Sequence, residues 1–293
     1  MAITETARAH VPKDSPRPRV REFDQPSRST TIAVWAVLAV LGLQLVGTIA
    51  SVLVNSLSRQ WFDSWLPTKW TAHWYSAAWE EFGLARVLGV TFIVGLTVVA
   101  LSLLIAVPAA YALVRSHFPG KRVALLALGL PVVLPTITYG VPLATLLYSL
   151  GLGGTLTGVI IINLVPAVPF AVLVLVPFLA AVDHKIEHAA RMCGASTAKV
   201  FLHILVPLMK NGILATAIVL LVRTLGNFDL TFLISDPDSQ TLVVALYYAV
   251  SAAGFRVNSS IDAMAVIYML TNVALLAFAF RYVNPSRMLA RTT

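Results

Sequence analysis

Long apolar stretches alternate with short polar ones along most of the chain. Three stretches contain no Asp, Glu, Lys or Arg: residues 29–58, 87–114 and 123–182. A helix needs about 20 apolar residues to cross about 30 Å of hydrocarbon, so the last stretch is long enough for two crossings. These runs are far too long for barrel strands, and helices satisfy their own backbone hydrogen bonds in lipid. The pattern therefore predicts an all-α, polytopic membrane protein.

Six transmembrane helices fit the pattern best. They are expected at about residues 31–55, 87–114, 123–148, 157–182, 208–232 and 262–283. A glycine-rich turn without charges, residues 149–156, separates the third helix from the fourth. Prolines are expected to break these two helices, and bends at membrane depth would suit a gate. They are Pro131, Pro135, Pro142, Pro166, Pro169 and Pro177. Residues 1–30 are expected to be a disordered cytoplasmic tail, 31–283 the transmembrane domain, and 284–293 a second cytoplasmic tail.

The composition excludes several other classes of protein. The chain is 58% hydrophobic and 12% charged, whereas soluble domains average about 25% charged residues. A net charge of +8 would suit nucleic-acid binding. The basic residues lie at the ends of the expected spans rather than in one patch, so no nucleic-acid partner is expected. Cys193 is the one cysteine, which excludes an intrachain disulfide.

Basic residues set the orientation through the positive-inside rule. With the N-terminus inside, the cytoplasmic segments contain six Lys/Arg in the first tail, three in 115–122, four in 183–210 and three in 281–293. The outer loops contain four: Arg59, Lys69, Arg86 and Arg256. Both termini and the segment 183–210 are therefore predicted to face the cytoplasm.

The first outer loop, residues 56–86, is rich in aromatic side chains. An interfacial belt at headgroup level is the favoured interpretation. A contact surface for a substrate-delivering protein is the alternative. The residues are Trp61, Trp65, Trp70, Trp74, Tyr75 and Trp79.

Local signals predict two short helices within residues 183–206. Asp183 can cap the first, and Ser196 or Thr197 the second; Gly194 supplies a left-handed residue between them. Glu187 and Arg191 form an i,i+4 pair on the first helix. Apolar residues recur at helical spacing: Ile186, Ala189, Ala190 and Cys193, then Val200, Phe201, Ile204, Leu205 and Leu208. The pattern alone fits equally a helix laid into a partner's groove and an amphipathic linker at the membrane surface.

The same segment resembles the signature loop of permease subunits of binding-protein-dependent ABC importers, of the polyamine and sugar type. The resemblance covers roughly residues 55–285, and Phe118-Pro119-Gly120-Lys121-Arg122 is similar to the Phe-x-Gly-[Lys/Arg] turn usual in these permeases. The family usually has Glu directly before a pair of alanines, which in this chain are Ala189 and Ala190. Here that position holds His188, and Glu187 stands one residue earlier, which rotates its carboxylate by about 100° around the helix. The resemblance implies an ATPase-coupling loop formed by Glu187, His188, Ala189, Ala190, Arg191, Gly194, Ile204 and Pro207.

The resemblance also implies the architecture and partners of a type I importer permease in the inner or plasma membrane. A second homologous permease, two cytoplasmic ATPases carrying ATP and Mg, and an extracytoplasmic binding protein are expected around it. The chain itself has no Gly-x-x-x-x-Gly-Lys-[Ser/Thr] phosphate loop, no catalytic grouping and no metal-ligand set. We therefore expect a transport subunit without its own cofactor. A secondary carrier is the alternative, although internal repeats are not evident.

Polar groups within the fifth expected span mark a candidate translocation path. Arg223, Asn227 and Asp229 lie there, and ionisable groups at membrane depth usually line a water-filled path or pair with one another. Snorkelling to the outer surface is the alternative for Asp229. Within the resembling family, the Trp70–Tyr75 region and the lack of the charged C-terminal extension often seen in sugar permeases imply the branch that handles polyamine-like solutes, with a sugar as the alternative.

Overall fold

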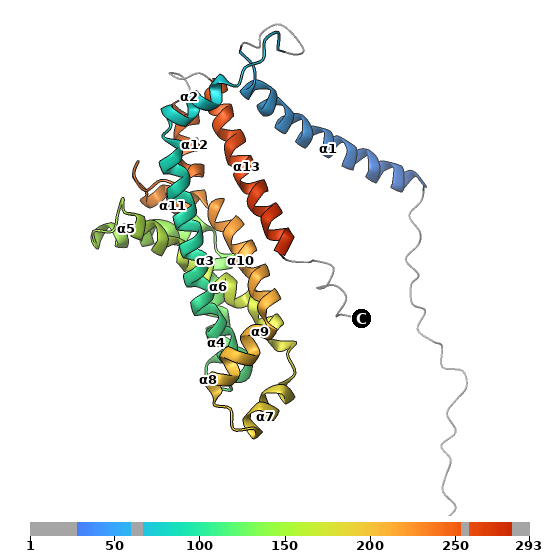
Figure 1. The fold of residues 1–293 in the computed structure, drawn as a ribbon, viewed down its shortest axis with the longest axis vertical. Helices are drawn as coiled ribbons and strands as arrows, with labels where there is room; N and C mark the ends of the chain where they lie inside the picture. Colours follow the sequence, from blue (N-terminus) through green and yellow to red (C-terminus); the bar gives the residue numbers. More distant parts are fainter. Residues whose placement is uncertain (1–27, 60–66, 253–257, 283–293) are drawn as a thin grey trace, which may run out of the picture. The chain divides into compact units, whose positions relative to one another are not determined.

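The computed structural model describes residues 28–59, 67–252 and 258–282, and all its elements in these ranges are helical (Figure 1). The all-α prediction is confirmed. The tail residues 1–27 and 284–293 lie outside the described ranges, while residues 28–30 belong to the first helix. The helices are α1 (Arg28–Ser56), α2 (His73–Glu81), α3 (Leu84–Arg115), α4 (Lys121–Val133), α5 (Thr136–Ser149), α6 (Leu156–Ala180), α7 (His184–Met192), α8 (Thr197–Val200), the π-helical η1 (Phe201–Leu205), α9 (Val206–Leu208), α10 (Lys210–Leu225), α11 (Phe228–Ile234), α12 (Leu242–Ser251) and α13 (Asn258–Tyr282).

Four of the described helices are long and apolar enough to cross a membrane: α1, α3, α6 and α13. Two bent helix pairs bring the number of candidate spans to six if each pair counts as one span. The chain divides into a unit ending at Ala50, whose described part is most of α1, and a larger unit that starts at Ser51.

The core of this unit lies between α3 and α6, which contact each other more extensively than any other pair of described helices. On α3 five of the buried residues recur at every fourth position, so they follow one ridge along the helix. They are Val94, Val98, Ser102, Ala106 and Ala110. Most of these side chains are small, which lets two helix backbones approach closely in a membrane. The α3–α6 pair is therefore the frame on which the more irregular helices are placed.

The third expected span, 123–148, is not one helix. It consists of α4 and α5, which meet at 96° across Leu134 and Pro135. Proline lacks an N–H group and disfavours the helical conformation of the residue before it, and Leu134 is accordingly extended, with φ −69° and ψ 144°. The expectation that the other prolines break the third and fourth spans is wrong. Pro131 lies inside α4 and Pro142 inside α5, and α6 runs unbroken through Pro166, Pro169 and Pro177.

The fifth expected span, 208–232, is also interrupted. It contains α10 and α11, separated by Gly226 and Asn227, and α10 begins after a 69° bend from the helical segment Thr197–Leu208. Asn227 has ψ 93°, which ends the helical path. The helix α12, in the loop that follows, was not predicted from the sequence.

Part of the outer aromatic loop packs against the rest of the fold. Trp61 and Trp65 lie outside the described residues, and Trp70 and Trp79 are 58% and 47% exposed, which fits an interfacial belt and a contact surface equally. Trp74 instead donates a hydrogen bond from its indole N–H to the carbonyl of Ser58 at 2.6 Å. It packs on a second core cluster formed by α2, α12, α13 and the start of α3. Part of this loop therefore closes one end of the fold.

Candidate coupling loop and translocation cavity

Local caps shape the segment after α6 as the sequence predicts. The carboxylate of Asp183 accepts a hydrogen bond from the N–H of Lys185 at 2.9 Å and caps α7. Gly194 has φ +83°, and its N–H donates to the carbonyl of Arg191. The N–H of Ala195 donates to the carbonyl of Ala190, five residues back, which completes a Schellman C-cap. Ser196, and not Thr197, caps α8.

Glu187 turns away from solvent and pairs with Arg115, the last residue of α3. The Arg115 Nε donates to Glu187 Oε1 at 2.5 Å, and both side chains are 5% exposed. A terminal nitrogen of Arg115 donates to the carbonyl of Val182 at 2.8 Å, and the other lies 2.9 Å from His184 Nε2. The Tyr111 hydroxyl, one turn earlier on α3, donates to the other carboxylate oxygen at 3.4 Å. This network joins the base of α7 to the end of α3.

The predicted pair of Glu187 and Arg191 is present but secondary. Its closest nitrogen–oxygen distance is 3.8 Å, and the Arg191 side chain is 44% exposed. Arg191 also donates to the hydroxyl of Tyr111 at 3.3 Å. The carboxylate is therefore directed at α3, so the described structure leaves no free Glu187 carboxylate for a partner.

The opposite face of α7 is open. His188, Ala189 and Cys193 are exposed, and Met192 is 89% exposed. Ala190 is half-buried against the main core cluster, so the Ala pair has one member facing inward and one facing outward. Small side chains beside a flexible Met leave a shallow, largely apolar surface onto which another protein can pack closely.

The second helical segment carries Ile204 and Pro207. Leu205 is fully buried, Ile204 is half-buried and Pro207 is exposed. The π-helical turn η1 ends at Leu205, two residues before Pro207, and its C-cap N–H at Val206 donates to the carbonyl of Phe201. Proline interrupts the regular i to i−4 hydrogen bonds, and a widened turn before it accommodates the ring. Together with the 69° bend that follows, this sets the direction in which the segment enters α10.

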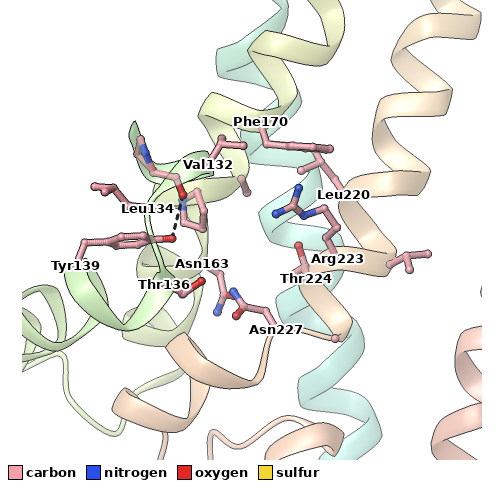
Figure 2. Close-up of a pocket in the computed structure, with 15 residues that line it drawn as sticks. Val132, Leu134, Thr136, Tyr139, Asn163, Phe170, Leu220, Arg223, Thr224 and Asn227 are labelled. Carbon is pink, nitrogen blue, oxygen red and sulfur yellow. Dashed lines mark hydrogen bonds between the residues drawn. The ribbon is translucent and has the colours of Figure 1, made fainter. Parts of the chain in front are cut away.

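A cavity of about 290 Å³ lies where the two interrupted spans meet α6 (Figure 2). The junction of α4 and α5 forms one wall, α6 the second, and the end of α10 with the break after it the third. Backbone that departs from helix at membrane depth is tolerated where it is enclosed by protein or lines a water-filled space. Its lining is Pro131, Val132, Leu134, Thr136, Tyr139, Asn163, Pro166, Ala167, Phe170, Leu220, Val222, Arg223, Thr224, Gly226 and Asn227.

Arg223 projects into this cavity from α10. It lies 13 residues after Lys210, and thus about 20 Å along the helix. Its guanidinium carbon is 4.2 Å from the centre of the Phe170 ring, a cation–π contact. It is the one charged residue among the described residues of the lining.

An amide network fastens the break after α10 to α6. Asn227 Nδ2 donates to Asn163 Oδ1 at 2.7 Å, and the buried Asn163 donates to Thr231 Oγ1 at 3.1 Å. Asp229, the third residue expected along the path, is exposed but does not line the cavity. The structure therefore places two of the three expected residues in the lining and the third just outside it, where the charge of Asp229 still acts on Tyr139 of the cavity wall, as that of Arg223 does.

Several residues of these sites were missed in the sequence. Arg115 marks the end of an apolar run, so it contributed only to the orientation. Asn163 and Phe170 sit in a charge-free run, where one polar or aromatic residue gives no signal of its own. In the described ranges, no three or more His, Cys, Asp or Glu residues lie close enough to hold a metal ion.

The sequence model of a transport family matches residues 102–288. The family is described as the binding-protein-dependent transport system inner membrane component. The chain belongs to this family. The permease is 30% identical over 208 residues to a Streptomyces antibioticus protein named as an ABC transporter permease, a match that covers 71% of the permease and 90% of the relative.

Other relatives match over shorter regions. The permease is 29% identical over 153 residues to the diacetylchitobiose uptake system permease protein NgcG of Streptomyces coelicolor, covering 52% of the permease and about half (51%) of that relative. Further matching relatives carry names that refer to trehalose, sulfate and molybdenum transport.

A solved structure has the same fold. A chain of a bacterial ABC transporter involved in the import of the acidic polysaccharide alginate superposes with a TM-score of 0.72 at 17% identity. The superposition covers 88% of the permease and 99% of that chain. A second structure holds the alginate transporter in complex with an alginate pentasaccharide-bound periplasmic protein, with a TM-score of 0.66 at 13% identity. The permease is thus a multi-pass inner-membrane protein of the importer fold, and it is a transport subunit rather than an enzyme.

Proposed function

We propose that α7 is the element through which this permease receives mechanical work from a cytoplasmic ATPase. One observation carries the proposal: α7 is fastened to the end of α3 by the Arg115–Glu187 ion pair on one face, and it offers an exposed surface of small and flexible residues on the other. A helix held in this way transmits a push from its outer face to the span behind it. The docking surface consists of His188, Ala189, Met192 and Cys193, and Glu187 belongs to the anchor.

The remaining residues of the loop direct this movement. Gly194 sets the angle between α7 and α8, and Ile204 and Pro207 set the entry into α10, which carries Arg223 to the cavity. Closure of an ATPase dimer would then displace α3 and α10 together and change the access to the cavity, as in the rigid-body movements of other switching proteins. ATP and Mg would be bound by the ATPase subunits.

The permease would form half of the translocation pathway, beside a second homologous permease. An extracytoplasmic binding protein would deliver the solute, and the alginate transporter provides the parallel through its complex with a periplasmic protein. Relatives whose names refer to diacetylchitobiose, trehalose and sulfate support a small polar solute. The polyamine-like solute stays a prediction, and the positive charge in the cavity argues against it.

The test uses Cys193, the one cysteine of the chain, on the exposed face of α7. An impermeant maleimide should fail to label it from outside intact cells and should label it in inside-out vesicles. In vesicles, co-assembled ATPases should slow labelling about tenfold or more, because a docked surface excludes the reagent.

Ser116→Cys in a Cys193→Ser chain is the matched control, since Ser116 is exposed in the other predicted cytoplasmic loop. Its labelling should depend less on the ATPases. Labelling of Cys193 from outside would overturn the orientation. Labelling from inside that the ATPases leave unchanged would overturn the docking surface.

A further inference from the structure

Arg223 stands in the cavity without a counter-charge. In the part of the chain that the structure describes, no carboxylate pairs with it and it donates no hydrogen bond. A charge at the centre of a membrane span costs at least about 2.5–3.5 kcal/mol. An exposed, unpaired charge in an otherwise neutral lining is available to a group of opposite charge that enters the cavity.

The contact with Phe170 orients Arg223 for binding. The ring lies against the guanidinium at 4.2 Å and takes up one side of it. Stacking on an aromatic face leaves the N–H groups in the guanidinium plane, and their fork matches the two oxygens of a carboxylate or of a sulfate-type group. Figure 2 shows the guanidinium end directed into the space between α6 and the α4–α5 junction.

Neutral polar groups complete the lining. Thr136, Tyr139, Thr224 and Asn227 surround the same space, and no Asp or Glu occurs among the described lining residues. Hydroxyl and amide groups can bind the neutral part of a solute, such as sugar hydroxyls. A volume of about 290 Å³ lies at the small end of ligand pockets, so the group bound at one time is small.

We propose that Arg223, backed by Phe170, binds the oxyanion of a small anionic solute during its passage. The inference rests on the proposed function, because it requires the cavity to belong to the translocation path. A cationic solute would meet the like charge of Arg223 in a medium of reduced dielectric constant, where repulsion is strong. An inorganic oxyanion and an acidic sugar present the same chemistry to the guanidinium.

The first experiment measures the charge of the cavity in the complete importer, in nanodiscs. Thr136→Cys in a Cys193→Ser chain places the one thiol of this subunit on the cavity wall. Modification by an anionic sulfonatoethyl and by a cationic trimethylammonium-ethyl methanethiosulfonate is followed by mass spectrometry. Arg223→Gln should lower the ratio of the anionic to the cationic rate by about tenfold, and Arg223→Lys should preserve it.

Arg86→Gln is the matched control, because Arg86 pairs with Asp238 at an exposed site and should leave the ratio unchanged. If neither reagent modifies the thiol, the cavity is not a solvated path and the proposed function fails. If both reagents react and Arg223→Gln does not change the ratio of the anionic to the cationic rate, only the inference of an anionic solute fails. Disassembly of the complex in both Arg223 variants would assign the charge to a subunit contact and would also overturn the inference.

The second experiment identifies the source of the oxyanion by protection of the same thiol. Sodium sulfate, sodium galacturonate, galactose and spermidine are compared at constant ionic strength. Sulfate, galacturonate or both should slow the neutral reagent methyl methanethiosulfonate about threefold, and Arg223→Gln should abolish this protection. Protection by sulfate alone indicates an inorganic oxyanion as the solute. Protection by galacturonate alone indicates an acidic sugar. Protection by galactose or spermidine, by none of the four, or independent of Arg223 would overturn the inference.

Discussion

Arg115 and Arg223 are both arginines on helices of candidate membrane spans, and their surroundings are opposite in kind. Arg115 ends α3, is 5% exposed, and each of its three nitrogens has a partner within 3 Å. Arg223 lies exposed in a cavity, with an aromatic ring on one side and no acceptor among the described residues. The charge of Arg115 is paired within the fold, whereas the charge of Arg223 has no partner among the described residues and is available to a solute. The comparison shows that the partners of an ionised group, more than its depth, indicate its role.

The two sites should also respond differently to neutralisation. Removal of one partner from a buried ion pair leaves an uncompensated charge in a poorly solvated place, which is costly. Removal of an unpaired charge from a cavity relieves a cost and leaves stability almost unchanged. Neutralisation should therefore lower stability at Arg115 but not at Arg223, whereas it should lower transport at both sites, at Arg115 because α7 loses its anchor and at Arg223 because the cavity loses its charge.

The largest effect is expected at the α3–α7 anchor. Arg115→Gln should weaken the attachment of α7 by about 3–5 kcal/mol, because Glu187 then stays buried without its partner. The double change Arg115→Met with Glu187→Met should cost much less, since two apolar side chains can replace a buried pair. Limited trypsin digestion at Arg191 and Lys199 reports the opening of the loop. Equal resistance of Arg115→Gln and the native permease would contradict the anchor.

Gly194→Val should have the next largest effect. A β-branched residue is strongly disfavoured at φ +83°, and even an ordinary residue costs about 1–2 kcal/mol in the left-handed region. No atom lies within 4 Å of an added Cβ, so the cost comes from the backbone and not from a clash. ATP hydrolysis should lose its stimulation by solute. Gly194→Asn, which tolerates this conformation, should retain most of it, and similar loss in both variants would show that the turn is not the cause.

Arg223→Gln should lower transport about tenfold, which corresponds to about 1.4 kcal/mol, with little change in thermal stability. Asp229→Asn should lower it less than about twofold, because Asp229 lies outside the cavity lining. The measurement is solute uptake by proteoliposomes of the complete importer with its binding protein, after size-exclusion chromatography has verified assembly. A greater loss with Asp229→Asn would reverse the assignment and favour a cationic solute.

The smallest effect is expected for the exposed pair of Arg86 and Asp238, whose side chains are 55% and 86% exposed. Surface pairs contribute about 0–1 kcal/mol. Asp238→Asn should therefore leave unfolding temperature and transport near the native values. A destabilisation comparable to that of Arg115→Gln would mean that burial does not explain the difference between the two pairs.

Local chemistry made much of the coupling loop predictable from the sequence. The caps at Asp183 and Gly194 depend on neighbours within a few residues, and they form as expected. The partner of Glu187 was not predictable in this way. A helical pattern offers Arg191, four residues away, but the closer contact is Arg115, which is 72 residues earlier in the chain. Only the packing of α7 under α3 brings that pair together.

The interrupted spans show a similar limit. Proline is a strong local signal, yet Pro135 breaks its helix while Pro166, Pro169 and Pro177 remain inside α6. Pro131 and Pro142 also stay inside α4 and α5, so a proline in the sequence does not by itself locate a break. The break at Gly226 likewise separates Asp229 from Arg223, which an unbroken helix would have carried on a shared span. The sequence therefore identified candidate residues, but only the folded structure shows which of them lie in the same cavity.

The anchor between Arg115 and Glu187 also has a consequence for biosynthesis. Arg115 leaves the ribosome 72 residues before its partner, roughly 4–14 s earlier at ordinary elongation rates. In the predicted orientation, with the end of α3 in the cytoplasm, the unpaired charge can help to retain that end inside while the span is inserted. Once Glu187 has been synthesised and α7 has folded, the Arg115 side chain pairs with it and becomes part of the contact between α3 and α7. One arginine would thus serve first the insertion of the permease and afterwards its movement.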